Sequence, residues 1–119
     1  MGLPSTKGML SQYPARQGAK NESVKTFAGP NPYTVISIAS PPTGGIIVKA
    51  SDLGLVDIDQ ADAWGSEDGQ FGAQVIFPAN PQGPVTQVNI QIFTLATGAE
   101  VGAVDLSAHA FRVWAKQGS

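Results

Sequence analysis

The sequence predicts an all-β protein: an antiparallel β-sandwich of the jelly-roll or immunoglobulin-like type, or a small barrel, with an extended N-terminal arm. Segments rich in β-branched residues recur at spacings of about 8–12 residues, as in sandwiches and barrels. The 119-residue chain has 14 glycines and nine prolines, which punctuate these segments as turns. Only 13% of its residues are charged, about half of the usual share of roughly 25%. This composition argues against a helical bundle, and the length fits one domain.

Residues 1–32 are interpreted as the arm and residues 33–119 as the β-sandwich body. The arm has few large apolar residues, and its four prolines interrupt regular structure. Such a segment buries too little apolar surface to offset the entropy lost on ordering. The arm has a net charge of +3, whereas the body has a net charge of −5. We therefore expect a basic arm, ordered against a partner, on an acidic body.

The first expected strands of the body surround a strongly marked turn. Residues 33–39 are β-branched and lie between prolines, which favours a strand. Residues 41–45 contain two prolines and two glycines and predict a turn, and residues 46–50 form the next strand. Residues 53–58 fit either a short strand or a loop.

The middle of the body contains the clearest periodicity. Residues 60–70 are polar and acidic and are expected to form a loop, and residues 71–77 form a strand that ends at a proline. Residues 80–84 form a rigid turn. Within residues 85–95, apolar residues alternate with glutamine and asparagine at period two, which predicts a strand with one apolar face. The amides of its polar face suit a packed assembly, although an ordinary solvated sheet face is favoured.

The end of the chain is expected to form a meander with residues 85–95. Residues 96–99 supply a turn, residues 100–106 return as a strand, and residues 109–115 form the last strand. No helix of any length is expected.

Metal and thiol chemistry is restricted by composition. The chain has no cysteine, and its single histidine excludes a multi-histidine metal site within one chain. The only plausible cation site is an acidic cluster that includes Asp57, Asp59, Asp62, Glu67 and Asp68. The cluster departs from the EF-hand pattern, because Asp62 occupies the position of the required glycine. A solvated acidic loop is therefore favoured over calcium, and no metal or cofactor is expected.

No catalytic constellation is recognised, so the protein is not expected to be an enzyme. A hydrolase triad would need His109 beside a nucleophile and a carboxylate. Ser107 and Asp105 are near in sequence, but a turn is expected between them and His109, and no Gly-x-Ser-x-Gly elbow is present. His109 is predicted to be a structural, hydrogen-bonded residue. Trp64, inside the acidic loop, either covers the body as a lid or lies exposed for a contact.

Phosphate, nucleic-acid and membrane binding are not indicated. Glycine-rich phosphate-binding motifs are absent, and the basic residues of the arm are sparse, with little aromatic interleaving. No run of about 18 apolar residues is present, and no signal peptide is recognised at the N-terminus.

The arm of residues 1–32, the turns 41–45 and 80–84 and the amide-rich strand 85–95 together have a recognisable organisation. In this organisation the whole chain resembles small bacteriophage virion proteins, above all the head decoration or cement proteins. The resemblance implies a structural protein located in the virion. It would bind the major capsid protein on the outer surface of the head, often as a dimer or trimer, and stabilise the head.

The residues of the arm support the same mechanism. An extended arm can add a strand to a sheet edge of the capsid protein while its side chains fill pockets, and many copies on one shell give avidity. The arm residues expected to contact the partner are Leu10, Tyr13, Arg16, Lys20, Lys25 and Phe27. This interpretation requires that the arm does not form part of the interior of its own body.

Two other functions are kept as alternatives. One is a different virion role, in the tail, neck or a fibre. The other is a carbohydrate- or protein-binding β-sandwich module, which a surface row of aromatic residues would indicate. Trp64 and Trp114 are the candidates for such a row. Trp114 alternates with Phe111 and Val113, so one of these two faces is expected to lie in the core.

Overall fold

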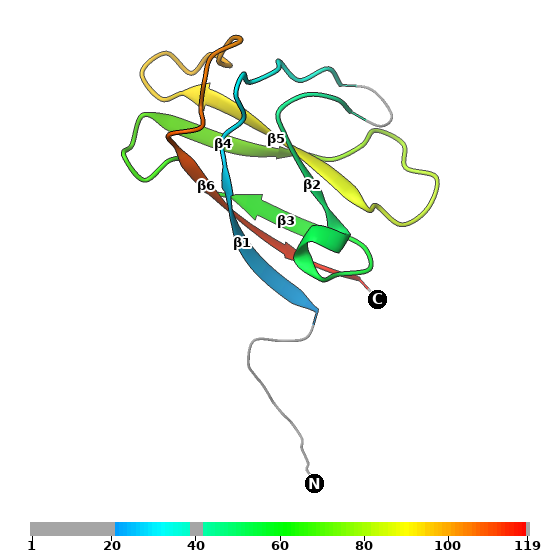
Figure 1. Cartoon of the computed structure of the whole chain (residues 1–119). Helices are drawn as coiled ribbons and strands as arrows, with labels where there is room; N and C mark the ends of the chain where they lie inside the picture. The colour runs from blue at the N-terminus through cyan, green and yellow to red at the C-terminus, as the bar shows by residue number, and fades with distance from the viewer. Residues whose placement is uncertain (1–20, 39–41, 119) are drawn as a thin grey trace, which may run out of the picture.

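The computed structural model describes residues 21–38 and 42–118, and the described part consists of strands joined by turns and loops (Figure 1). The elements are β1 (Glu22–Ala28), β2 (Ile46–Lys49), the 3₁₀ helix η1 (Ala50–Leu53), β3 (Gln60–Ala63), β4 (Phe71–Ile76), β5 (Gln87–Thr94) and β6 (Ala110–Lys116). They form two antiparallel three-stranded sheets, with the orders β1-β6-β3 and β2-β5-β4. The prediction of an all-β protein is confirmed. Within the described residues, no helix is long and apolar enough to cross a membrane.

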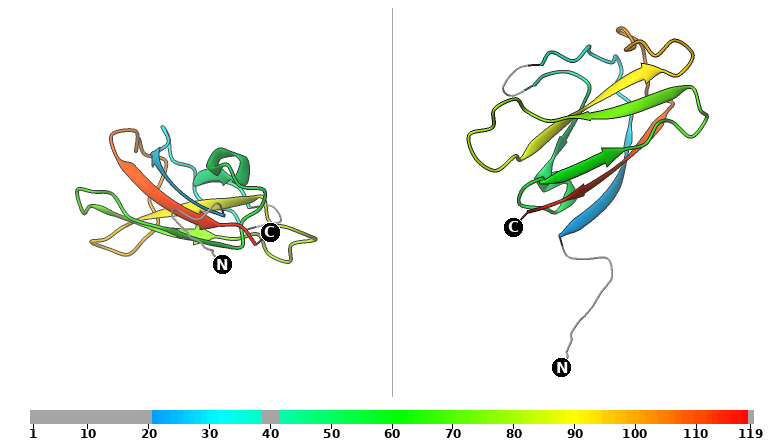
Figure 2. Two further views of the ribbon diagram at one scale, coloured as in Figure 1. Left: turned by 90° about the horizontal axis from the view of Figure 1, so that it is seen from below. Right: turned by 180° about the vertical axis from the view of Figure 1, so that it is seen from behind.

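The alternating pattern of each central strand determines which face it buries. In β6, Phe111 and Val113 are fully buried, and in β5 Val88, Ile90 and Ile92 are fully buried. These side chains belong to one hydrophobic cluster that draws on both sheets. The two sheets also approach one another where β3 and β4 lie side by side, as the rear view in Figure 2 shows.

β1 shows that the expected boundary between arm and body is wrong. Residues 22–28, assigned to the arm, pair along their whole length with β6, from Glu22 opposite Lys116 to Ala28 opposite Ala110. Gly29 continues the contact, because its N–H donates to the carbonyl of His109 at 2.8 Å. The body therefore includes residues 21–32. Residues 1–20, which carry the rest of the expected arm, lie outside the described residues.

Two segments expected to be strands do not belong to either sheet. Within residues 33–38, a single bridge joins Ser37 to Thr43, and residues 39–41 lie outside the described residues. Residues 100–106 make one bridge, between Phe93 and Glu100. The expected meander is therefore wrong, because β5 and β6 lie in different sheets. The Glu100 carboxylate accepts hydrogen bonds from the hydroxyl of Tyr33 and the N–H of Ile36, which belong to the segment before β2.

The segment expected to be an acidic loop begins as a strand. Residues 60–63 form β3, where Ala61 and Ala63 pair with Ala115 and Val113 of β6. Both alanines pack against the core, so their small side chains allow a mostly polar segment to join the sheet. Of residues 53–58, Leu53 ends η1 and the rest form the loop that follows it; Leu53, Leu55 and Ile58 are buried.

Candidate functional site

Of the six arm residues expected to contact a partner, the structure describes Lys25 and Phe27. Phe27 is partly buried and packs against the protein's own core, and its expected role as an anchor in a partner pocket stays a prediction. Lys25 is exposed, with its Nζ 5.4 Å from the centre of the Phe27 ring and 3.5 Å from the carbonyl oxygen of Asp52. The structure does not describe Leu10, Tyr13, Arg16 and Lys20.

The acidic residues of the expected cation site are not brought together. Asp62 lies in β3 opposite Trp114, whereas Asp57 accepts a hydrogen bond from the N–H of Gly118 at 2.8 Å. Asp68 lies in the turn before β4. An extended strand separates successive carboxylates, and nowhere in residues 21–38 and 42–118 do three His, Asp or Glu side chains gather to hold a metal ion. The described arrangement therefore gives the calcium alternative no ligand set.

His109 is hydrogen-bonded, as the sequence predicted, but to Asp68 and not to Asp105. Its Nδ1 lies 2.9 Å from the Asp68 carboxylate, and its ring stands edge-on to Phe71 with centroids 4.8 Å apart. The other Asp68 oxygen accepts a hydrogen bond from the Ser66 hydroxyl at 2.6 Å. The hydrogen bonds from Ser66 and from the backbone N–H of Gln70, followed by His109, lower the pKa of Asp68.

This cluster does not have the geometry of a hydrolase. The Ser66 hydroxyl donates to a carboxylate and not to an imidazole, so the Ser-His contact of a hydrolase triad is not formed. Ser107 donates from its N–H and its hydroxyl to Asp105, which lowers the pKa of Asp105. We conclude that these groups close turns and join the turn before β4 to the start of β6.

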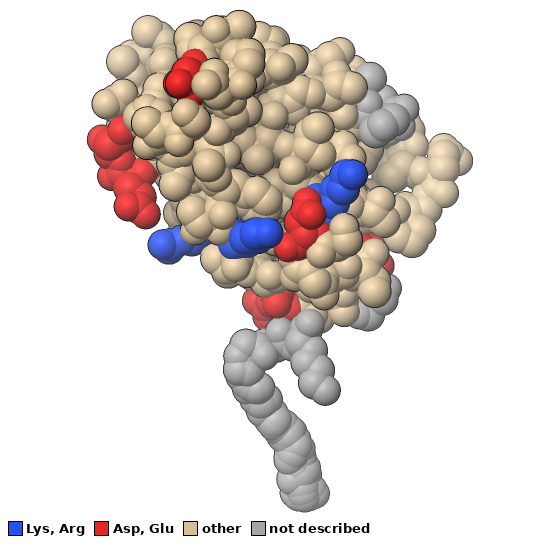
Figure 3. Space-filling model, in the orientation of Figure 1, with Lys and Arg blue, Asp and Glu red and all other residues tan. Residues whose placement is uncertain are grey.

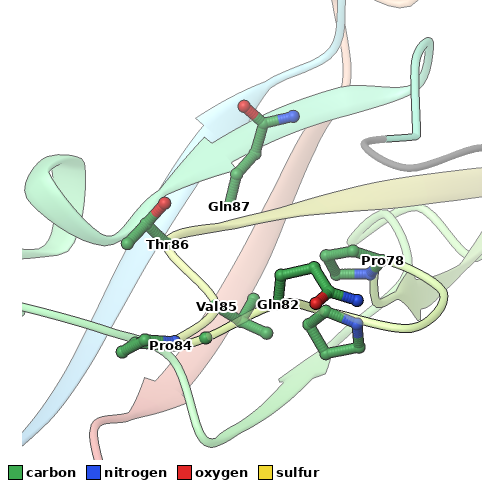
Figure 4. A pocket seen from close by; sticks show the side chains of 8 residues that line it. Pro78, Gln82, Pro84, Val85, Thr86 and Gln87 are labelled. Carbon is green, nitrogen blue, oxygen red and sulfur yellow. The ribbon is translucent and has the colours of Figure 1, made fainter.

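The loop between β4 and β5 forms an uncharged hollow of about 430 Å³ (Figure 4). Its lining consists of Pro78, Pro81, Gln82, Gly83, Pro84, Val85, Thr86 and Gln87. Prolines and amides supply neither a nucleophile nor an acid–base pair. This hollow therefore offers an uncharged contact surface.

The outer face of the β1-β6-β3 sheet carries both tryptophans. Phe111 and Val113 occupy the core, so Trp114 is on the opposite, outward face, where its indole N–H donates to Glu22 at 3.0 Å. The backbone N–H of Trp64 donates to the carbonyl of Arg112 at 2.9 Å and extends the pairing of β3 with β6. Trp64 thus lies opposite Arg112 on the outward face and is 48% exposed. Of the two roles considered for Trp64, exposure is correct and the lid is not.

A hollow of about 210 Å³ lies beside Trp64 on this outward face. It is lined by Thr26, Trp64, Gly65, Glu67, Ala110 and Arg112. Sequence reasoning did not single out Thr26 or Arg112. The alternation of residues 110–116 already placed Arg112 and Trp114 on one face, but the contribution of β1 depends on a pairing over a long stretch of sequence.

The outer face of the β2-β5-β4 sheet is nearly free of charge. Lys49 is the single charged residue in these three strands. Exposed apolar side chains include Ile47 in β2 and Leu95 directly after β5, at 48% and 55% exposure. Asn89 is fully buried and donates to the carbonyl of Gly44 at 2.8 Å, so the amide pattern of this strand is partly satisfied within the chain.

Figure 3 shows how sparse the charges are over one face of the molecule. Most of the visible surface is neither acidic nor basic, and the Lys and Arg side chains lie in its middle and lower part. Core regions of protein interfaces are depleted of charge in the same way. No family model, curated protein or solved structure matches the chain.

Proposed function

We propose that the protein is a non-catalytic component of a bacteriophage virion that binds the major capsid protein on the outside of the head and stabilises it. The observation that carries the proposal is the nearly uncharged outer face of the β2-β5-β4 sheet, with Ile47 and Leu95 exposed on and beside it. Burying these apolar side chains against a partner is favourable and leaves few charges to desolvate. We also assign the two sheets to a β-sandwich, because side chains from both enter one core.

For residues 22–28 the requirement that the arm stay outside its own body fails, so the tether is now proposed for residues 1–20 alone. β1 belongs to the body, so residues 1–20 are the remaining candidate tether. This segment retains Lys7, Arg16 and Lys20 and contains no acidic residue, and the +3 charge assigned to the longer arm is therefore unchanged. It also retains Leu10 and Tyr13 as candidate anchors. Against a capsid surface of negative potential, this charge favours association.

Self-association into a dimer or trimer is part of the proposal. Capsid proteins are arranged around symmetry axes, so a decorating protein gains avidity when several linked copies bind together. The open edges of both sheets provide surfaces for such contacts.

The experiment combines particle composition with a charge introduced on the proposed face. Mass spectrometry of purified phage particles from the source of this sequence is expected to detect the chain, and electron microscopy is expected to place it on the head. Ile47→Glu is expected to weaken co-sedimentation with expanded capsids, because it buries a carboxylate in the interface. Val56→Glu, at an exposed loop position, is the matched control and is expected to bind normally.

Each result can contradict the proposal. Absence of the chain from particles would exclude a virion role, and a location on the tail, neck or a fibre would favour the other virion role. Full binding by Ile47→Glu would show that the uncharged face is not the interface.

A carbohydrate- or protein-binding module is the second candidate function. The observation that favours it is the pair of tryptophans on the outer face of the β1-β6-β3 sheet, with Trp64 half exposed. Surface aromatic side chains of this kind supply large, rigid contact areas at little entropic cost.

A further inference from the structure

Two strands, β1 and β6, and the segment directly after β3 build the hollow beside Trp64. Thr26 of β1 lies opposite Arg112 of β6, and Arg112 lies opposite Trp64, so the three side chains form one row across the outward face. Gly65 follows Trp64 at a position where a Cβ would lie 2.2 Å from the carbonyl oxygen of Phe71. Glycine at this position therefore allows the chain to turn closely past β4, and Glu67 reaches the rim of the same hollow.

The polar groups that line the hollow have unused hydrogen-bonding capacity. Within the part of the chain that the structure describes, the side chains of Thr26, Trp64, Glu67 and Arg112 make no hydrogen bond or salt bridge. Glu67 and Arg112 line the same space without pairing with one another. In contrast, the indole N–H of Trp114 on this face is already bound to Glu22.

This combination of groups favours a neutral ligand that both donates and accepts hydrogen bonds. The guanidinium offers several donors, and the carboxylate offers only acceptors. An anion would be repelled by Glu67, and a cation by Arg112. Hydroxyl groups satisfy both sides, because a hydroxyl donates one hydrogen bond and accepts others. Hydrogen bonds to charged groups are also stronger than those between neutral groups.

The indole supplies the apolar part of the site. Trp64 is 48% exposed, so one side of a large aromatic surface is available to a ligand. A pyranose ring has an apolar C–H face that packs flat on such a surface, while its hydroxyls point outward from its edge toward polar groups. Sites with a hydrophobic wall and a few convergent polar groups are typical of small-ligand binding.

We propose that this hollow binds one neutral sugar ring, which stacks on Trp64 and shares its hydroxyls between Arg112, Glu67 and Thr26. The inference deepens the second candidate function by naming a ligand class and a site. It does not depend on capsid binding, because the two sites lie on different sheets. The hollow lies on the outer face of the β1-β6-β3 sheet, and the proposed capsid face lies on the β2-β5-β4 sheet.

The test is a titration of the full-length, isotope-labelled chain followed by two-dimensional NMR. The probes are neutral hexoses, pentoses and N-acetylhexosamines, as free sugars and as α- and β-linked disaccharides. Millimolar binding by at least one probe is expected, with shifts of the Trp64 indole N–H and of the Arg112 and Ala110 amides. The Trp114 indole N–H, which is already hydrogen-bonded, is expected to shift less.

Variants separate stacking from hydrogen bonding. Trp64→Ala is expected to weaken binding at least about tenfold, Trp64→Tyr is expected to retain most of it, and Glu67→Gln and Arg112→Gln are each expected to weaken it severalfold. Leu95→Ala removes an exposed apolar side chain elsewhere and is the matched control, expected to bind normally. The spectrum of each variant without sugar shows whether it is folded.

Three results would overturn the inference. These are no shift at the hollow with any neutral sugar, equal binding by folded Trp64→Ala, or tighter binding of hexuronates or peptides than of neutral sugars. If capsid binding fails in the separate assay while sugars bind, the site stands and the capsid proposal falls. The converse result rejects the site alone.

Discussion

At the scale of single residues, the hydroxyl of Tyr33 joins three segments that are distant in the sequence. It donates to the Glu100 carboxylate at 2.6 Å and accepts from the backbone N–H of Ile92 in β5 at 3.1 Å. The same carboxylate oxygen accepts the N–H of Ile36 at 2.8 Å. Tyr33 is fully buried, so these polar groups depend on one another and not on water.

Tyr33→Phe is therefore expected to lower the free energy of unfolding by about 2 kcal/mol, because it leaves the Ile92 N–H and the Glu100 carboxylate without this partner. Urea denaturation measures the change. Glu100→Gln retains an acceptor and is expected to cost less than Glu100→Leu. A Tyr33→Phe variant as stable as the wild type would contradict this account.

The pKa of Tyr33 gives an alkaline test of the same network. Burial, together with the hydrogen bond to Glu100, raises the pKa of Tyr33 far above its usual range. A raised pKa in the folded state means that the stabilisation is complete below about pH 10, where the unfolded tyrosine ionises, and decreases as the pH rises further. The difference in stability between wild type and Tyr33→Phe should therefore shrink above about pH 10.

Asp68 determines part of the response to acid. Its hydrogen bonds from Ser66 and Gln70 and its contact with His109 lower its pKa in the folded state. A lowered pKa stabilises the fold above about pH 4, the pKa of an unfolded Asp, and this stabilisation is lost as the pH falls through the folded-state pKa. Asp68→Asn is expected to make the acid decrease in unfolding free energy shallower.

Denaturation at a series of pH values between about 2 and 5 measures this slope, because this range includes the usual Asp pKa of about 4 and extends below it. Asp105→Asn is expected to act in the same direction, because hydrogen bonds from Ser107 lower the pKa of Asp105. The control is Glu67→Gln, because the Glu67 carboxylate has no hydrogen-bond partner among the described residues. This variant is expected to keep the slope of the wild type. If the Asp68→Asn, Asp105→Asn double variant loses unfolding free energy with falling pH as steeply as the wild type, these two carboxyl groups are not the source of the acid sensitivity.

At the scale of elements, the sequence was informative where a strand buries one full face. The expected strands at 46–50, 71–77, 85–95 and 109–115 correspond to β2, β4, β5 and β6. In β5 the apolar residues at period two are all buried, as the local pattern predicted, whereas the burial of Asn89 between them was not predicted by that pattern.

β1 could not be recognised in the same way. Its core-facing positions include Ser23 and Lys25 beside Phe27, because an edge strand is covered on one side only. Its pairing with β6 spans most of the chain and leaves no local signal. The hollow beside Trp64 depends on the same pairing, so Trp64 and Trp114 were recognisable as candidates but Thr26 was not.

The position of β1 predicts different outcomes for two truncations. Removing residues 2–20 is expected to leave the thermal midpoint close to that of the full chain. Removing residues 2–31 deletes β1, exposes an edge of β6 and removes the packing of Phe27, so the midpoint is expected to fall by many degrees or the protein to aggregate. Circular dichroism during heating measures both. Equal midpoints for the two truncations would show that β1 contributes little to the fold.

We expect Lys25 to protect the open edge of β1 from pairing with other strands. It lies on the core-facing side of an edge strand but extends to solvent, and a second strand placed there would bury its charge. Lys25→Val is expected to raise the mean mass in analytical ultracentrifugation relative to the wild type. Thr26→Val, at the same edge but with no change of charge, is the control. A Lys25→Val variant of unchanged mass would show that another feature protects the edge.

At the scale of the whole molecule, charge of opposite sign is divided between the N-terminal segment and the rest of the chain. Residues 1–20 have three basic residues and no acidic residue, whereas the remaining chain has an excess of acidic residues. If the capsid proposal is correct, part of the affinity is electrostatic, because a basic segment approaching a surface of negative potential gains from long-range attraction. Salt screens such attraction over a Debye length of about 10 Å at 0.1 M ionic strength.

Capsid co-sedimentation of the wild type is therefore expected to weaken as salt increases. The variant with Lys7→Gln, Arg16→Gln and Lys20→Gln is expected to bind less at low salt and to respond less to added salt, because its first 20 residues are neutral. The control, Lys116→Gln, removes a positive charge from β6, in the sheet that does not carry the proposed capsid face, and should keep most of the salt response of the wild type. If instead the body variant loses the salt response and the N-terminal variant keeps it, the electrostatic contact belongs to the sheets, and residues 1–20 are not the tether.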